Sequence, residues 1–346
     1  MIYLGQNISY KYTMNGNLEK LCRRITDYAD NQMGIWQWGQ GVALYSLAQV
    51  FKKQKAEFCM DYIKSWIDDR LSEEYPGKSI NTTAPCLSAL ERYKLSGETR
   101  YIKLCEDFAD WCMAQAPRSE RGAFEHSCTE NTYPNQMWAD TLFMGCLFLA
   151  EYGVFTGRRM YVYEALRQYR LHDEFLKDKS TNLIVHGYYG NERRQEGCVW
   201  GRGNGWLAAG TPIILSLADE SFSDYHAVKE NFIRYMAALV TYQNADGSWN
   251  TVVDSPDSYP EMTATAAFAF ALSEGMRLGI LDKDCYKKHA DLAYAALEKN
   301  IGADGTLQNA SGGTCIMHTA EEYNAVPVCY SPFAQGLAIL ALNCRY

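Results

Sequence analysis

The chain has 346 residues, of which 47% are hydrophobic and 21% charged, a composition typical of a globular protein with a large core. Its formal net charge of −8 and sequence pI near 5.4 argue against a surface for nucleic acid or for an anionic membrane. The sequence contains no run of about 18 apolar residues, so no transmembrane helix is expected.

Six segments share one pattern, in which an aromatic or glycine-rich loop runs directly into an apolar helix rich in small residues. They lie at residues 36–44, 81–90, 133–144, 199–208, 259–266 and 330–338. A helix that is apolar on all sides is buried. The pattern therefore predicts six inner helices.

A second kind of helix, amphipathic and more highly charged, alternates with the first. These helices are expected at residues 18–30, 56–69, 101–115, 160–177, 226–243 and 286–299. Charged faces lie outside, so the alternation predicts an all-α (α/α)6 barrel. This repeat overrides the two domains that length alone suggests, and we expect one catalytic domain over residues 1–346. Short β pieces are expected only at 187–190 and 246–249, and His172, His226 and His289 are expected to face solvent from outer helices.

All six loops precede inner helices, so they are expected to meet at one end of the barrel, the mouth. Helix N-termini there present unpaired N–H groups and positive dipole ends, which favour an anionic ligand. Six tryptophans are expected to ring the mouth as surfaces on which sugars stack: Trp36, Trp38, Trp138, Trp200, Trp206 and Trp249. For any one of them alone, core packing is the alternative.

Asp140 is the sharpest catalytic candidate. It lies between apolar neighbours where the third inner helix is expected to begin. A carboxylate at this position is either an N-terminal cap or a catalytic group. Apolar and indole surroundings are expected to raise its pKa, which would make it a proton donor near neutral pH.

Arg202 lies between glycines and tryptophans without an acidic neighbour in the sequence. Its guanidinium matches a substrate carboxylate, and a structural ion pair is the alternative. Asn204 and the adjacent glycines would let the backbone approach a ligand closely. His126 and His186 are loop histidines beside aromatic residues, suited either to orienting a water or sugar hydroxyl or to a structural role.

Glu261 is expected to begin the fifth inner helix, with Thr263 close behind. It is either the N-terminal partner of the helix dipole or the second carboxylate of a conventional glycosidase, with Asp254 and Asp257 as weaker candidates. The chain has no phosphate-binding glycine loop, no H-E-x-x-H, no EF-hand and no C-x-x-C pattern, so we expect no cofactor and no metal. Unpaired cysteines and an N-terminus without signal-peptide character indicate a cytoplasmic location.

Three motifs, at residues 133–140, 200–206 and 259–266, resemble in order and spacing those of glycoside hydrolase family 105, the unsaturated rhamnogalacturonyl hydrolases, and of the related family 88 unsaturated glucuronyl hydrolases. The resemblance extends from about Trp36 to Phe333. It implies an (α/α)6 barrel that removes a terminal 4,5-unsaturated uronic acid from lyase-generated oligosaccharides, which would be derived from rhamnogalacturonan, by hydrating the C4=C5 vinyl ether.

The resemblance also implies site roles, with Asp140 as general acid/base and Arg202 on the uronate carboxylate. This chain departs from the family by carrying Asn81 where we expect many relatives to have an acidic residue. Its segment 125–131, which contains His126, is also lengthened. The complete set expected to bind the oligosaccharide is Trp36, Trp38, Asn81, His126, Tyr133, Trp138, His186, Trp200, Arg202, Asn204, Trp206, Glu261 and Thr263.

Three other functions fit the same barrel. A sugar epimerase would rely on several histidines at the mouth. A conventional inverting glycosidase would need Glu261 together with Asp140. A catalytically silent toroid would bind the oligosaccharide without turnover.

Overall fold

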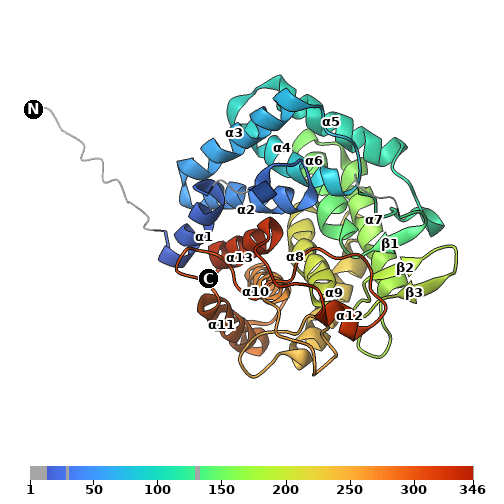
Figure 1. Ribbon diagram of the computed structural model, residues 1–346. Helices are drawn as coiled ribbons and strands as arrows, with labels where there is room; N and C mark the ends of the chain where they lie inside the picture. Colours follow the sequence, from blue (N-terminus) through green and yellow to red (C-terminus); the bar gives the residue numbers. More distant parts are fainter. Residues whose placement is uncertain (1–13, 29–30, 129–132, 346) are drawn as a thin grey trace, which may run out of the picture.

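The structure is a computed structural model that describes residues 14–28, 31–128 and 133–345. Helices alternate along the chain between an inner and an outer ring (Figure 1). The inner ring comprises α2 (Trp38–Gln54), α4 (Ala84–Ser96), α6 (Leu147–Thr156), α8 (Gly201–Leu217), α10 (Met262–Arg277) and α13 (Pro332–Cys344). The outer ring comprises α1 (Gly16–Thr26), α3 (Glu57–Glu73), α5 (Thr99–Ala114), α7 (Arg159–Leu176), α9 (Tyr225–Leu239) and α11 (Lys283–Lys299).

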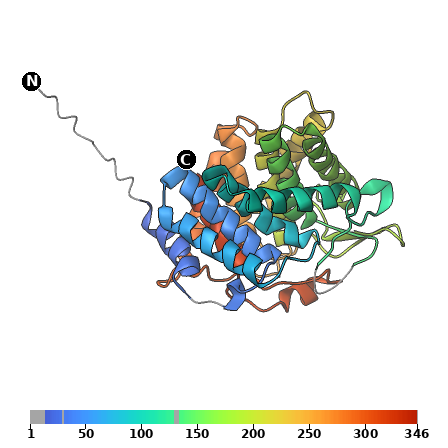
Figure 2. The same cartoon turned by 90° about the horizontal axis from the view of Figure 1, so that it is seen from above.

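The inner ring is closed. Each inner helix packs against the next, and α13 returns to pack against α2. The expected (α/α)6 architecture is thereby confirmed, and the six outer helices lie within a few residues of their expected bounds. Figure 2 shows the segment that carries the short helix α12 (Ala320–Asn324) at one end of the helices. Within the described ranges, no helix combines the length and apolarity that a membrane crossing requires.

Glycines allow the inner helices to approach one another closely. A Cβ atom on Gly41 of α2 would lie 2.5 Å from the backbone nitrogen of Pro85 at the start of α4. A Cβ atom on Gly336 of α13 would lie 2.9 Å from the carbonyl oxygen of Val42. Both distances are shorter than van der Waals contact, so the small residues of these segments set the spacing at which the ring closes.

A three-stranded antiparallel sheet lies beside the ring. It consists of β1 (Gln136–Trp138), β2 (Gly187–Tyr189) and β3 (Arg194–Glu196), in that order. Trp138 pairs with Gly187, so the strand before Asp140 runs beside the strand that follows His186. Of the two short hairpin or loop pieces expected from the sequence, the one at 187–190 contains β2, and residues 246–249 form a turn in which Asp246 accepts a hydrogen bond from the Ser248 backbone N–H.

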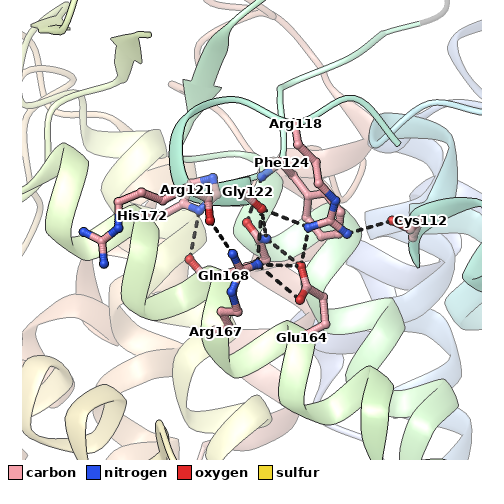
Figure 3. Close-up of polar contacts among 9 residues, drawn as sticks. All are labelled: Cys112, Arg118, Arg121, Gly122, Phe124, Glu164, Arg167, Gln168 and His172. Atoms are coloured by element: carbon pink, nitrogen blue, oxygen red, sulfur yellow. Dashed lines mark hydrogen bonds and ion pairs between the residues drawn. The ribbon is translucent and has the colours of Figure 1, made fainter. Parts of the chain in front are cut away.

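The loop before His126 is clamped to α7 (Figure 3). The Gly122 carbonyl accepts hydrogen bonds from Arg118 (2.9 Å) and Gln168 (2.9 Å). The Gln168 side chain in turn accepts the Phe124 backbone N–H at 2.8 Å. Glu164 completes the clamp by pairing with Arg118 and Gln168. These contacts fix the position of the segment that links α5 to His126.

His172 is buried, and the expectation that it faces solvent was wrong. Its Nδ1 lies 2.9 Å from the Gln168 carbonyl oxygen one turn earlier on α7. Burial disfavours the charged imidazole and lowers the pKa of His172 to about 4. His172 lies on the same helix face as Gln168 and Tyr169, so the face that packs inward carries it into the core.

Replacing Gly41 by alanine is expected to destabilise the fold by about 1–3 kcal/mol, because the added methyl group would force α2 and α4 apart. Urea unfolding followed by circular dichroism measures the change. The matched control is Gly16→Ala in α1, where an added Cβ meets nothing within 4 Å. Equal unfolding midpoints for the two variants would show that the close approach is not needed.

Candidate active site

Asp140 lies in the turn between β1 and a π-helical turn (Leu142–Cys146) that continues into α6. Its Oδ1 accepts a hydrogen bond from the Trp206 indole N–H at 3.0 Å, and its Oδ2 lies 3.5 Å from Nε2 of His186. Both carboxylate oxygens therefore face side chains from other parts of the chain. Within the described residues, neither oxygen bonds to a backbone N–H, so the Asp140 side chain does not cap a helix. The residue is 8% exposed, and its Oδ2 is buried without a hydrogen-bond partner among the described residues.

The pKa of Asp140 differs from the sequence expectation. Burial raises the pKa of this carboxyl, but the adjacent His186 imidazole and the positive charge of Arg202 outweigh burial and hold the pKa below its usual value. The expectation of a raised pKa is therefore wrong for this structure. That expectation was based on the apolar neighbours of Asp140 in the sequence. The polar partners His186 and Arg202 come from other parts of the fold.

His186 is completely buried, and Tyr323 of α12 orients it. The Tyr323 hydroxyl lies 2.7 Å from His186 Nδ1 and accepts the Met317 backbone N–H at 3.2 Å. The Tyr323 hydroxyl accepts the Met317 N–H, so it can donate its own proton to His186 Nδ1. The neutral imidazole then carries its proton on Nε2, which faces Asp140. Burial lowers the pKa of His186, which favours this neutral form.

Sequence reasoning missed Tyr323. It lies in a five-residue helix that begins with a capping box between Thr319 and Glu322. The T-x-x-E pattern could have predicted the helix start. Nothing in the sequence, however, places that helix beside a histidine 137 positions earlier.

The expected tryptophans gather around these groups, with two exceptions. Trp138 stacks on His126 with 4.3 Å between ring centroids, and Tyr133 packs on Trp138 at 4.5 Å. Trp200 packs on His186 at 4.0 Å. Trp38 stacks on Phe333 at 4.5 Å and meets the edge of Trp206 at 6.0 Å.

Two of the six tryptophans lie away from Asp140. Trp36 donates its indole N–H to the Thr82 carbonyl at 2.9 Å, beside Asn81 at the start of the second inner segment. Trp249 is fully buried in the core, where it packs against Phe268 and donates to the Leu239 carbonyl. The expectation that Trp249 rings the mouth was wrong, because the turn before it directs the indole inward between α9 and α10.

Asn81 and His126 meet at Cys128. The Asn81 amide nitrogen lies 3.0 Å from the Cys128 sulfur, and His126 Nε2 lies 3.5 Å from the same sulfur. The amide oxygen of Asn81 is buried and has no hydrogen-bond partner within the described ranges, so it can accept a ligand hydroxyl. Burial lowers the pKa of His126 to about 4, so this imidazole is neutral near pH 7.

Arg202 is buried, with 1% of its surface exposed, and neutral groups hold it. One terminal nitrogen donates to the Ser311 carbonyl at 3.0 Å and the other to the Gly312 carbonyl at 2.8 Å. Its guanidinium carbon lies 4.4 Å from the centre of the Trp200 ring. The structure thus brings Arg202 and Asp140 into one cluster, with the segment before α12 bonded to the guanidinium.

Three of the expected binding residues are buried and stabilise the fold through contacts within the protein. The Asn204 side chain exchanges hydrogen bonds with the Ile184 backbone. Glu261 is fully buried at the N-cap of α10, where it accepts backbone N–H groups from Thr263, Ala264 and Ser311. Thr263 is also fully buried. The dipole role for Glu261 is therefore the one that the structure favours.

Three other inner helices begin without a side-chain cap. The first N–H groups of α2, α8 and α13 make no hydrogen bond with the side chain of the N-cap residue. These N–H groups and their positive dipole ends lie at the end of the barrel that carries Asp140 and Arg202. The mouth is therefore suited to a ligand with a negative charge.

Known proteins share both the sequence and the fold. Residues 13–345 match the family described as Glycosyl Hydrolase Family 88. The chain is 32% identical to the unsaturated rhamnogalacturonyl hydrolase YesR of Bacillus subtilis (strain 168) over 89% of this chain and 88% of that relative.

Two solved structures extend the comparison. A possible member of the GH105 family from Salmonella enterica superposes with a TM-score of 0.91 at 28% identity, over 99% of this chain and 98% of the other. Unsaturated glucuronyl hydrolase from Bacillus sp. GL1 shares the fold with a TM-score of 0.73 at 17% identity, over 94% of each chain. By sequence and by fold, the chain belongs to glycoside hydrolase family 105, the unsaturated rhamnogalacturonyl hydrolases, which are related to family 88.

Proposed function

We propose that this protein removes the terminal 4,5-unsaturated uronic acid from oligosaccharides that a polysaccharide lyase releases from rhamnogalacturonan. The observation that carries the proposal is the single carboxylate of Asp140, held between an indole N–H and an imidazole in the cluster that contains Arg202. The B. subtilis relative, at 32% identity, supports the substrate class.

The C4=C5 bond of such a substrate belongs to a vinyl ether, so one proton donor can start the reaction. Asp140 protonates C4, and an oxocarbenium-like centre forms at C5. The resulting Asp140 carboxylate takes a proton from a water molecule as that water attacks C5. The hemiketal then opens to release a keto-uronic acid and the shortened sugar, and no second carboxylate is needed.

The low pKa of Asp140 determines when this acid gains its proton. Near neutral pH the carboxyl is ionised before substrate binds. A bound uronate brings a second negative charge close to Asp140 and excludes water, and both effects raise a carboxyl pKa. Protonation of Asp140 thus belongs to the enzyme–substrate complex.

Arg202 is the cation for the uronate carboxylate in this proposal. Its terminal nitrogens bond to neutral carbonyls, and a carboxylate is the stronger acceptor for a guanidinium. Its Nε is buried without a hydrogen-bond partner within the described part of the chain. The Asn81 amide oxygen accepts one of the hydroxyls of the sugar.

We also propose a reducing compartment, such as the cytoplasm, as the location. All twelve cysteines lie within the described ranges and are free thiols. Free thiols in this number are typical of a compartment in which glutathione or thioredoxin prevents disulfide formation.

Replacing Asp140 by asparagine is expected to lower kcat by about 10²- to 10⁴-fold, the usual contribution of a general acid/base. Loss of absorbance of the unsaturated uronate measures turnover. The matched control is Asp173→Asn, because Asp173 is also 8% exposed but pairs with Arg234 on the outer ring. Near-normal turnover by the Asp140 variant would contradict the mechanism.

Replacing His186 by asparagine is expected to shift the alkaline limb of the kcat profile to higher pH. His186 lowers the pKa of Asp140, so its loss raises that pKa and keeps the acid protonated at higher pH. Tyr323→Phe is expected to shift the limb in the same direction by a smaller amount, since without the Tyr323 hydroxyl the His186 proton is no longer held on Nε2, facing Asp140.

The position of the limb, and not the height of the profile, is the readout for these two variants. Tyr294→Phe, which removes a buried hydroxyl at the α11–α13 contact, is the control and should leave the limb in place. A shift of the limb to lower pH in the His186 variant would show that the imidazole acts in another way.

Glu261→Gln is expected to retain turnover within severalfold, because the carboxylate of Glu261 binds backbone N–H groups. The same variant should lose about 0.5–2 kcal/mol of stability through its weakened cap. Thermal unfolding and the chromophore assay measure the two effects. A 100-fold or greater loss of turnover with an intact fold would instead favour the conventional two-carboxylate glycosidase.

A further inference from the structure

A second cavity, of about 490 Å³, lies at the opposite end of the barrel from Asp140, where the inner helices end. Its lining comes from α2, α6, α8, α10 and α13, so it lies on the axis of the ring. This volume is within the range of about 300–1,000 Å³ that is usual for small-molecule sites.

An aromatic layer separates this cavity from the active site. The ring of Tyr45, which forms part of the cavity wall, meets Phe143 at 6.2 Å between centroids, and Phe143 meets Trp206 at 5.4 Å. Trp206 in turn donates to Asp140. The cavity is therefore a separate space behind the catalytic group and not an extension of the mouth.

Two neutral polar groups in the cavity wall lack partners. The Tyr45 side chain is 97% buried (3% exposed), and its hydroxyl makes no hydrogen bond with any described residue. One turn later on α2, the Gln49 amide nitrogen is buried and has no partner among the described residues either. A buried polar group without a partner costs about 1–3 kcal/mol, so a ligand that bonds to the Gln49 amide nitrogen gains affinity.

The charged groups of the wall, by contrast, are already engaged. Glu274 accepts hydrogen bonds from Arg277 at 2.8 Å and from the Cys344 thiol at 2.7 Å. Lys53 donates to the Asn343 carbonyl at 2.6 Å, and Glu151 lies 3.7 Å from Lys94. Lys52 pairs with Glu91 at 3.5 Å, so Lys53 is the one charged group of the described wall that is held by a neutral carbonyl.

The ends of the helices limit the ligand further. The inner helices direct their C-terminal carbonyls and negative dipole ends toward this end of the barrel, which disfavours an anion and offers hydrogen-bond acceptors. Ile213, Phe270 and Leu340 supply an apolar wall. The lining therefore combines donors, acceptors and an apolar face, and its formal charge of +1, from Lys52, Lys53 and Arg277 against Glu151 and Glu274, is offset by the negative dipole ends.

We propose that this cavity binds a neutral polyhydroxylated molecule of monosaccharide size, with Tyr45 and Gln49 as its hydrogen-bonding partners. Sugar hydroxyls both donate and accept, so they satisfy the Tyr45 hydroxyl, the Gln49 amide and the helix carbonyls together. The C–H face of the same ring covers the apolar wall. This site is independent of the hydrolase function proposed above.

The test is titration calorimetry of the full chain with L-rhamnose, D-galactose, D-glucose and myo-inositol, with the active site kept saturated by the products of its own reaction. We expect at least one of these compounds to bind with a stoichiometry of one. Tyr45→Phe and Gln49→Met, which retain the shape of each side chain, should each weaken that binding at least tenfold. Both variants should hydrolyse the unsaturated oligosaccharide at the unmodified rate.

Asp140→Asn is the converse control and should leave this binding unchanged. The proposal is overturned if none of the four compounds binds, or if binding is insensitive to both α2 variants. It is equally overturned if galacturonate or putrescine binds more tightly than the neutral compounds, because the site would then select charge.

Discussion

A carboxylate that leaves water needs partners, and Asp140 obtains them from the Trp206 indole and the His186 imidazole. Trp206 comes from the sixth position of α8, and His186 comes from the segment before β2. Asp140 itself follows β1, which pairs with β2. The Asp140 carboxylate thus lies where three separate segments of the chain converge. The closed ring of inner helices fixes the relative positions of these three segments.

The contacts of Asp140 with Trp206 and His186 have two opposing effects. The partners that make burial of the carboxylate tolerable also lower its pKa, which opposes the acid role proposed for Asp140. A substrate that carries its own negative charge reverses that effect in the complex. In the proposed mechanism, a bound uronate raises the pKa of Asp140 more than a neutral sugar in the same place would. The charge of the substrate would then contribute to selectivity through Asp140 as well as through attraction to Arg202.

Arg202 and Glu261 act together on the segment that follows α11. Arg202 bonds to the carbonyls of Ser311 and Gly312, while Glu261 accepts the Ser311 N–H. The same segment leads to α12 and hence to Tyr323, which orients His186. One cation and one carboxylate therefore position the part of the chain that fixes the imidazole, although neither bonds to it directly.

The sequence by itself determined the twelve-helix alternation, the position of Asp140 at the start of the third inner segment and the gathering of Trp38, Trp138, Trp200 and Trp206. Helix periodicity and small-residue content act locally, so they can be read from neighbouring residues. Only the tertiary structure decided the direction of the Asp140 pKa, the role of Tyr323, the cap formed by Glu261 and the inward positions of Trp249 and His172. Each of these depends on partners or packing contributed by other elements of the fold, and a local pattern carries no record of which distant group will face it.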